Sequence, residues 1–164
     1  MNRYVTACAA TALLAGGVAV LYPMVQPPSV CTKEKACMSN LKQLGSMVLL
    51  YASDNDGHLP LDQWVTATSP YGKGGGPYEC PSITQTASAN QRRSGYALNV
   101  SIAGRVADRL NRTTVLLFET DSLNSNVIAN LATRSGRHDG ASNVAFIDGH
   151  VKRARLGEVL RGNP

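Results

Sequence analysis

The side chains that most often carry out catalysis form no recognisable constellation in this sequence. Three His residues and eleven Asp and Glu residues are scattered along 164 residues, and their spacing matches neither a Ser-His-Asp nor a Cys-His arrangement. The glycine-rich stretch at residues 73–77 is not followed by the Gly-Lys-Ser/Thr that a phosphate-binding loop requires. We therefore expect a protein that is not an enzyme and that holds no cofactor and no metal.

The four cysteines are the other residues that could carry chemistry. Cys8 lies in an apolar segment, which leaves Cys31, Cys37 and Cys80 for the rest of the chain. Cys31 and Cys37 are six residues apart, a poor spacing for a bridge within a helix, and no Cys-x-x-Cys motif or His cluster indicates zinc. In an exported chain we expect a disulfide between Cys37 and Cys80. Two buried thiols are the alternative.

The N-terminal segment decides where the chain is located. Residues 4–22 contain no charged side chain, and as a helix they span about 28 Å, close to the thickness of a bilayer's hydrocarbon core. We expect residues 1–30 to be a single-pass membrane anchor, with Arg3 on the inner side. A cleaved secretory signal, cut near Gly17-Val18-Ala19, is the alternative. In both cases the domain of residues 31–164 lies outside the cytoplasm.

A long helix is expected directly after this segment. Thr32 is a suitable N-cap, and apolar residues recur at spacings of three and four on one helical face: Cys37, Leu41, Leu44, Val48 and Tyr51. The helix should end at residues 54–57, where poor helix formers precede Pro60. Prolines between residues 23 and 28 separate it from the apolar segment, so the two together form one long, interrupted helix.

Short strands are expected in the second half of the chain. Residues 66–95 are rich in Thr, Ser, Gly and Pro and predict a loop, whereas strand patterns occupy residues 95–100, 113–119, 143–147 and 150–155. This order predicts an α+β fold, in which the N-terminal helix packs on one face of a small antiparallel sheet. Asp148-Gly149 suits a type I′ hairpin turn, a register that places Val144, Phe146 and Val151 toward the helix.

The C-terminal part of the chain carries a signature. Residues 136–152 read GRHDGASNVAFIDGHVK, in which His138 is followed by nine residues and then by Asp148 and Gly149. This resembles the H-X9-DG signature of prepilin-type, type II secretion-like proteins of bacteria. Residues 37–45 (CMSNLKQLG) and 51–57 (YASDNDG) are similar to the helix of these proteins and to its end. Residues 80–82, 95–99 and 114–118 also fit, so the resemblance covers most of residues 31–155.

The resemblance implies a pseudopilin-like (type IV pilin-like) structural or assembly subunit of a secretion or pilus-like system. Its partners would be the membrane and other pilin-like subunits, contacted through the N-terminal helix. Its location would be the bacterial inner membrane, with most of the chain on the periplasmic side. From the residues alone we interpret Asp148-Gly149 as a turn and His138 as a hydrogen-bonding residue of a loop, with a ligand role for His138 as the alternative.

The basic second half of the chain supports another class of function. The formal net charge is +5, and residues 91–164 carry eleven Lys and Arg against six Asp and Glu. Clustered arginines bind phosphate groups, so the alternative is a membrane-anchored, pilin-like protein that binds DNA or another polyanion. Aromatic residues, which would offer stacking platforms, make up only 5% of the chain. The candidate contacts are Arg92, Arg93, Arg105, Arg109 and Arg112.

Overall fold

The computed structural model describes residues 30–75, 77–83 and 94–160. Its helices are α2 (Val30–Asp54) and α3 (Trp64–Thr68), and its strands are β1 (Tyr96–Asn99), β2 (Val115–Glu119), β3 (Ile128–Ala129), β4 (Ala141–Phe146) and β5 (Val151–Arg155). The expected anchor or signal falls almost wholly on residues 1–29, outside the described residues. Within the described ranges, no helix is both long enough and apolar enough to span a membrane.

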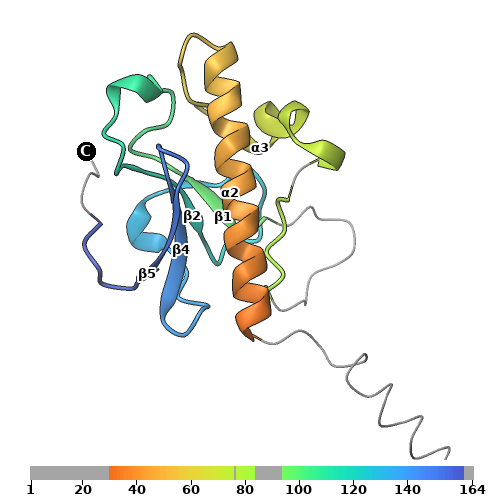
Figure 1. Cartoon of the computed structure of the whole chain (residues 1–164), viewed down its shortest axis with the longest axis vertical. Helices are drawn as coiled ribbons and strands as arrows, with labels where there is room; N and C mark the ends of the chain where they lie inside the picture. Colours follow the sequence, from red (N-terminus) through yellow and green to blue (C-terminus); the bar gives the residue numbers. More distant parts are fainter. Residues whose placement is uncertain (1–29, 76, 84–93, 161–164) are drawn as a thin grey trace, which may run out of the picture.

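The strands form one mixed sheet in the order β3-β1-β2-β4-β5, with α2 lying across one face (Figure 1). Three neighbouring pairs are antiparallel, whereas β3 runs parallel to β1. The predicted α+β class, with a long helix on a small sheet, is confirmed, but the prediction of a wholly antiparallel sheet was wrong. β2 ends beside the start of β1, where Glu119 lies opposite Tyr96. A short connection from there reaches the other edge of β1 at its starting end, so β3 runs in the same direction as β1.

The apolar stripe of α2 packs as its spacing predicts. The backbone of α2 lies close to the sheet at Gly45, where a Cβ atom would be 3.8 Å from the Cβ of Ala145. Tyr51, at the end of the stripe, is only half-buried and packs edge-to-face against Tyr71, with ring centroids 6.3 Å apart. The other four residues of the stripe are fully buried: Cys37, Leu41, Leu44 and Val48. Burial of such side chains stabilises the fold by about 1.5–3 kcal/mol each, which fixes α2 on the sheet.

The β4–β5 hairpin differs from its predicted form. Ala145 pairs with Val151, whereas the expected two-residue turn would place Phe146 opposite Val151. The N–H of Gly149 donates to the carbonyl of Phe146 (2.9 Å), and Gly149 has a φ of +84° while Asp148 is not among the residues with positive φ. This is a three-residue loop, a type I turn followed by a left-handed glycine, and not a type I′ turn.

Val151 packs on the helix side of the sheet, and in the observed register its partner Ala145 lies there with it, so the neighbouring side chains of β4 lie on the other face. Ala145 faces α2, whereas Val144 and Phe146 belong to a second, smaller core on the far face. Leu131 and Leu160 cover that core. The sheet is therefore buried on both faces, and the prediction that Val144 and Phe146 pack against the helix was wrong.

Contacts with a distant part of the chain produce α3, which overlaps the start of the segment predicted as a loop. The side-chain oxygen of Asn126 accepts the backbone N–H of Val65 at 2.8 Å, at the start of α3. The Trp64 indole N–H donates to the carbonyl of Val127 at 2.9 Å. The first bond satisfies a backbone N–H that the start of a short isolated helix leaves open, and the second satisfies the buried indole of Trp64.

Candidate functional site

Four side chains that could carry chemistry meet in the core beneath α2. They are Cys37, Cys80, Glu119 and His138, and we call them the buried cluster. One donor atom from each lies within 4.8 Å of the donor atoms of the other three. Relative exposure is 4% for Cys80 and 0% for the other three residues, so neither solvent nor a substrate reaches the buried cluster in this structure.

Cys37 and Cys80 reach the cluster from opposite sides of the core. Cys37 is the first buried residue of the α2 stripe, and its Sγ atom lies 3.6 Å from the Ser82 hydroxyl, to which it donates. Cys80 is held by its backbone N–H, which donates to the carbonyl of Ser94 at 3.1 Å. Gly95 makes room beside it: φ is +83° there, and a Cβ atom would lie 3.2 Å from the Cβ of Cys80.

Glu119 and His138 form the other half of the buried cluster. Glu119 ends β2, and its Oε1 atom lies 2.9 Å from Nε2 of His138. The backbone N–H of Asn143 donates to Oε2 of Glu119 at 2.7 Å, and the Asn143 amide donates to Oε1 at 3.1 Å. These bonds compensate the buried carboxylate for its lost hydration.

Arg137 brings a positive charge to the same place. Its Nη1 atom and the Cβ of Cys80 each lie 3.2 Å from the position of a Gly95 Cβ atom. Contact with Cys37 and the charge of Arg137 lower the pKa of the Cys80 thiol against the effect of burial, while contact with Cys80 and burial raise the pKa of Cys37. Burial lowers the pKa of His138, but the hydrogen bond and charge of Glu119 raise it further, above its ordinary value. Of the two thiols, Cys80 is therefore the one whose pKa is lowered.

The two halves of the sequence signature do not meet. His138 precedes β4, whereas Asp148 and Gly149 form the turn after it. The Asp148 carboxylate accepts the backbone N–H of His150 at 3.1 Å and also contacts the His150 ring. His138 is therefore a buried hydrogen-bonding residue, and Asp148-Gly149 serves the hairpin.

The candidate disulfide residues are brought together, but they are free thiols in this structure. The disulfide stays a prediction, since the structure places both sulfurs in one cluster without a bond between them. Sequence reasoning did not single out Glu119. Its one sequence signal is a carboxylate at the end of the apolar run Val115–Glu119.

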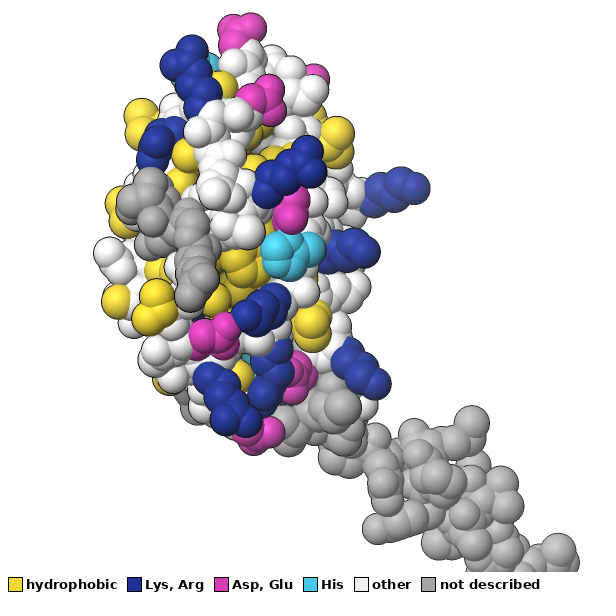
Figure 2. All heavy atoms as spheres, turned by 60° about the vertical axis from the view of Figure 1, so that its left-hand side comes forward, with side chains coloured by type: hydrophobic (Ala, Val, Ile, Leu, Met, Phe, Trp, Pro, Cys, Tyr) yellow, Lys and Arg dark blue, Asp and Glu magenta, His cyan; other side chains and the backbone are white. Residues whose placement is uncertain are grey.

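The candidate polyanion contacts are placed only in part. Arg92 and Arg93 lie outside the described residues. Arg105, Arg109 and Arg112 are exposed on the segment between β1 and β2. On the face that Figure 2 shows, Lys and Arg side chains stand among Asp and Glu side chains and do not form a continuous basic surface.

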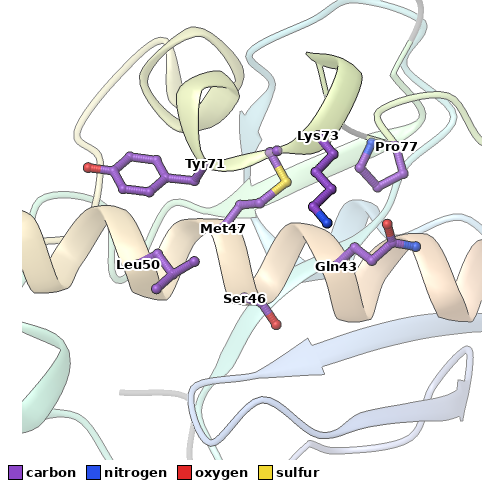
Figure 3. A pocket seen from close by; sticks show the side chains of 8 residues that line it. Gln43, Ser46, Met47, Leu50, Tyr71, Lys73 and Pro77 are labelled. Atoms are coloured by element: carbon purple, nitrogen blue, oxygen red, sulfur yellow. The ribbon is translucent and has the colours of Figure 1, made fainter.

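An open groove of about 260 Å³ lies between α2 and the 3-10 turns at Ser69–Tyr71 and Lys73–Gly75 (Figure 3). Met47 and Leu50 line it from the helix, and Tyr71 and Lys73 from the turns. Lys73 extends toward α2, beside Gln43 (Figure 3). No titratable cluster lines this groove in the described part of the chain, so we do not treat it as a reaction site.

Comparison of the chain with protein-family models, with curated proteins and with solved structures finds no significant match.

Proposed function

We propose that this protein is a non-enzymatic, pilin-like structural or assembly subunit of a secretion or pilus-like system. In this proposal residues 4–22 hold the chain in the bacterial inner membrane, and α2 connects them to the folded domain outside. The observation that carries the proposal is the arrangement of α2. A 25-residue helix begins eight residues after the charge-free segment and buries one face on the sheet.

The opposite face of α2 is available to a neighbouring subunit. Lys42, Gln43 and Ser46 are exposed, and Leu50 is 52% exposed although it is a large apolar residue. Anchored copies that lie side by side in one membrane would meet through the helices nearest their anchors. We expect this outer face of α2 to form the contact between subunits.

The buried cluster supports a structural role for its residues. It joins α2, the Cys80 loop, β2 and the segment before β4, and each of its side chains is at least 96% buried. Residues in such a position hold elements together and have no access to a dissolved substrate.

Polyanion binding remains the alternative function. Arg105, Arg109 and Arg112 are exposed, whereas two other arginines of the basic half are already engaged. Arg134 donates to the carbonyls of Arg155 (3.1 Å) and Glu158 (3.0 Å). Arg153 donates to the Glu34 carboxylate at 2.8 Å and to the carbonyl of His138 at 2.7 Å. These guanidinium groups bind parts of their own chain.

Site-directed photocross-linking in intact membranes tests the proposal. A photoreactive residue replaces Ser46 on the outer face of α2, and a matched variant carries it at Ala132, exposed in the loop on the far face of the sheet. We expect covalent dimers and higher oligomers from the Ser46 position and few from Ala132. Equal yields from both positions, or none from Ser46, would contradict the proposed interface. Salt-sensitive retention on DNA together with that result would favour the alternative.

A further inference from the structure

The donor atoms of the buried cluster form a set that no other part of the described chain repeats. Two thiols, one imidazole and one carboxylate come from four segments separated by long stretches of sequence, and they lie within 4.8 Å of one another. Because each belongs to a different segment, local chain geometry does not explain their meeting. We propose that Cys37, Cys80, Glu119 and His138 are the ligands of a buried structural zinc ion.

The chemistry of these donors suits zinc. Zn²⁺ takes Cys sulfur, His nitrogen and carboxylate oxygen, and structural sites hold it with four protein ligands and no open position. In a tetrahedral site with ordinary bond lengths, neighbouring ligand atoms lie about 3.3–3.8 Å apart. The separations of up to 4.8 Å seen here require the side chains to close by about 1 Å around the ion.

A buried nitrogen atom without a partner provides a second observation. Nη1 of Arg137 has no hydrogen-bond partner among the described residues, although Nε and Nη2 of the same guanidinium donate to Ser135 and Thr120. An unsatisfied buried donor is costly in a folded core. An ion held between Glu119 and His138 takes Nε2 of His138, the nitrogen that faces Glu119, and the two thiolates that it requires supply negative charge beside the Arg137 guanidinium.

The surroundings of the cluster also fit a metal site. Asn143 holds the Glu119 carboxylate through two hydrogen bonds, at 2.7 and 3.1 Å, and such outer contacts orient ligands. Two thiolates and one carboxylate carry one negative charge more than Zn²⁺ neutralises. Arg137 is the cation next to Cys80, and its other ionic partner, 3.6 Å away, is the solvent-exposed carboxylate of Asp121. The proposed ion joins α2 to the sheet.

A disulfide between Cys37 and Cys80 would use the same sulfurs, so it is the competing outcome. It would be neutral, would give Glu119 and His138 no partner beyond each other and Asn143, and would place uncharged sulfur beside the Arg137 cation. The convergence of all four donors is explained by the zinc site and not by the disulfide.

Metal analysis of the full-length protein tests this proposal. The chain is extracted from membranes in detergent without reductant or chelator, and zinc is measured per chain. We expect about one zinc ion per chain of the unmutated protein. Cys80→Ser and His138→Gln should each retain at least about tenfold less zinc, because mutation of residues that merely hydrogen-bond to metal ligands already lowers metal affinity by about that factor. His150→Gln, which changes an exposed histidine on the hairpin, is the control and should keep its zinc. Replacement by Co²⁺ should give a thiolate-to-cobalt charge-transfer band that Cys80→Ser lacks.

The unmutated protein alone decides the question if a variant does not fold. The site is supported if the protein contains zinc and if both thiols become alkylated after chelation and denaturation in the absence of any reductant. A Cys37–Cys80 disulfide in non-reduced peptides overturns it. The site is also overturned if folded protein with free thiols takes up no added Zn²⁺. It is overturned as well if the Cys80 and His138 variants retain as much zinc as the unmutated protein.

Discussion

Replacing Gly95 with Ala should destabilise the protein through the walls of the buried cluster. Gly95 has a φ of +83°, and an added Cβ atom would contact Ile83 and lie 3.2 Å from both the Cβ of Cys80 and Nη1 of Arg137. Gly149 is a matched control, since its φ is +84° and a Cβ atom there would meet nothing within 4 Å. The two substitutions therefore share the backbone strain and differ in the collision.

The expected magnitudes follow from these two terms. The left-handed backbone costs an L-residue about 1–2 kcal/mol, and the loss of unfolded-state entropy on Gly→Ala is common to both variants. Forcing an extra carbon into a packed core costs about 1–3 kcal/mol more. Gly95→Ala should therefore lower the free energy of unfolding by about 2–5 kcal/mol, and Gly149→Ala by about 1–2 kcal/mol.

Urea unfolding measures the difference between the two variants. The chain has one tryptophan, Trp64, which is fully buried, so its fluorescence reports unfolding of the domain in detergent-solubilised, full-length protein. A gap between Gly95→Ala and Gly149→Ala below about 0.5 kcal/mol would refute the packing that we describe around Cys80, because surface-like substitutions stay within that range.

The remaining predictions use the same unfolding assay. Leu44→Ala, in the buried stripe, should cost about 2–5 kcal/mol, whereas Leu50→Ala should stay within about 0.5 kcal/mol; similar losses would contradict the assigned faces of α2. Glu119→Ala should cost about 3–5 kcal/mol, because it leaves His138 as a buried group without its ionic partner, and a loss below 1 kcal/mol would argue against that pairing. Asp148→Asn should cost less than about 1 kcal/mol, since the amide oxygen can still accept the backbone N–H in the turn. Burial opposes the shift, but the hydrogen bonds from His150 lower the pKa of Asp148; its stabilising effect should thus be full above the unfolded pKa of about 4 and vanish as pH falls through the lower folded value. A difference between wild type and Asp148→Asn that grows on acidification would contradict this sign.

The regular elements could be predicted because their patterns are local. The spacing of Leu41 and Leu44 depends only on the helical repeat, and both are fully buried. The run Val115–Glu119 is a strand with every residue buried. In both elements one short window of sequence holds the whole signal.

Features that depend on distant parts of the chain could not be predicted. Asp148-Gly149 is compatible with a two-residue and a three-residue loop. The choice between them decides whether Phe146 or Ala145 shares a face with Val151. The two-residue strand Ile128–Ala129 is too short for a periodic pattern. Its parallel pairing with β1 follows from where β2 ends.

The buried cluster illustrates the same limit. The helical stripe was enough to assign Cys37 to the core, and the sequence was enough to assign His138 a hydrogen-bonding role in a loop. Their meeting with Cys80 and Glu119 arises from the order of the strands and from the space beside Gly95. No spacing between these residues in the sequence encodes this meeting.

The mature N-terminus of the protein in its native membrane tests the central claim most directly, because the claim requires an anchor that stays attached. Mass spectrometry and N-terminal sequencing of the membrane fraction should find a chain that retains the charge-free segment of residues 4–22 and resists extraction by salt. A start just before or within the beginning of that segment would indicate pilin-like processing, and an intact Met1 would indicate an unprocessed anchor. A freely soluble, exported chain that begins after Ala19 would contradict the account, because no anchor would remain to align the α2 helices of neighbouring subunits.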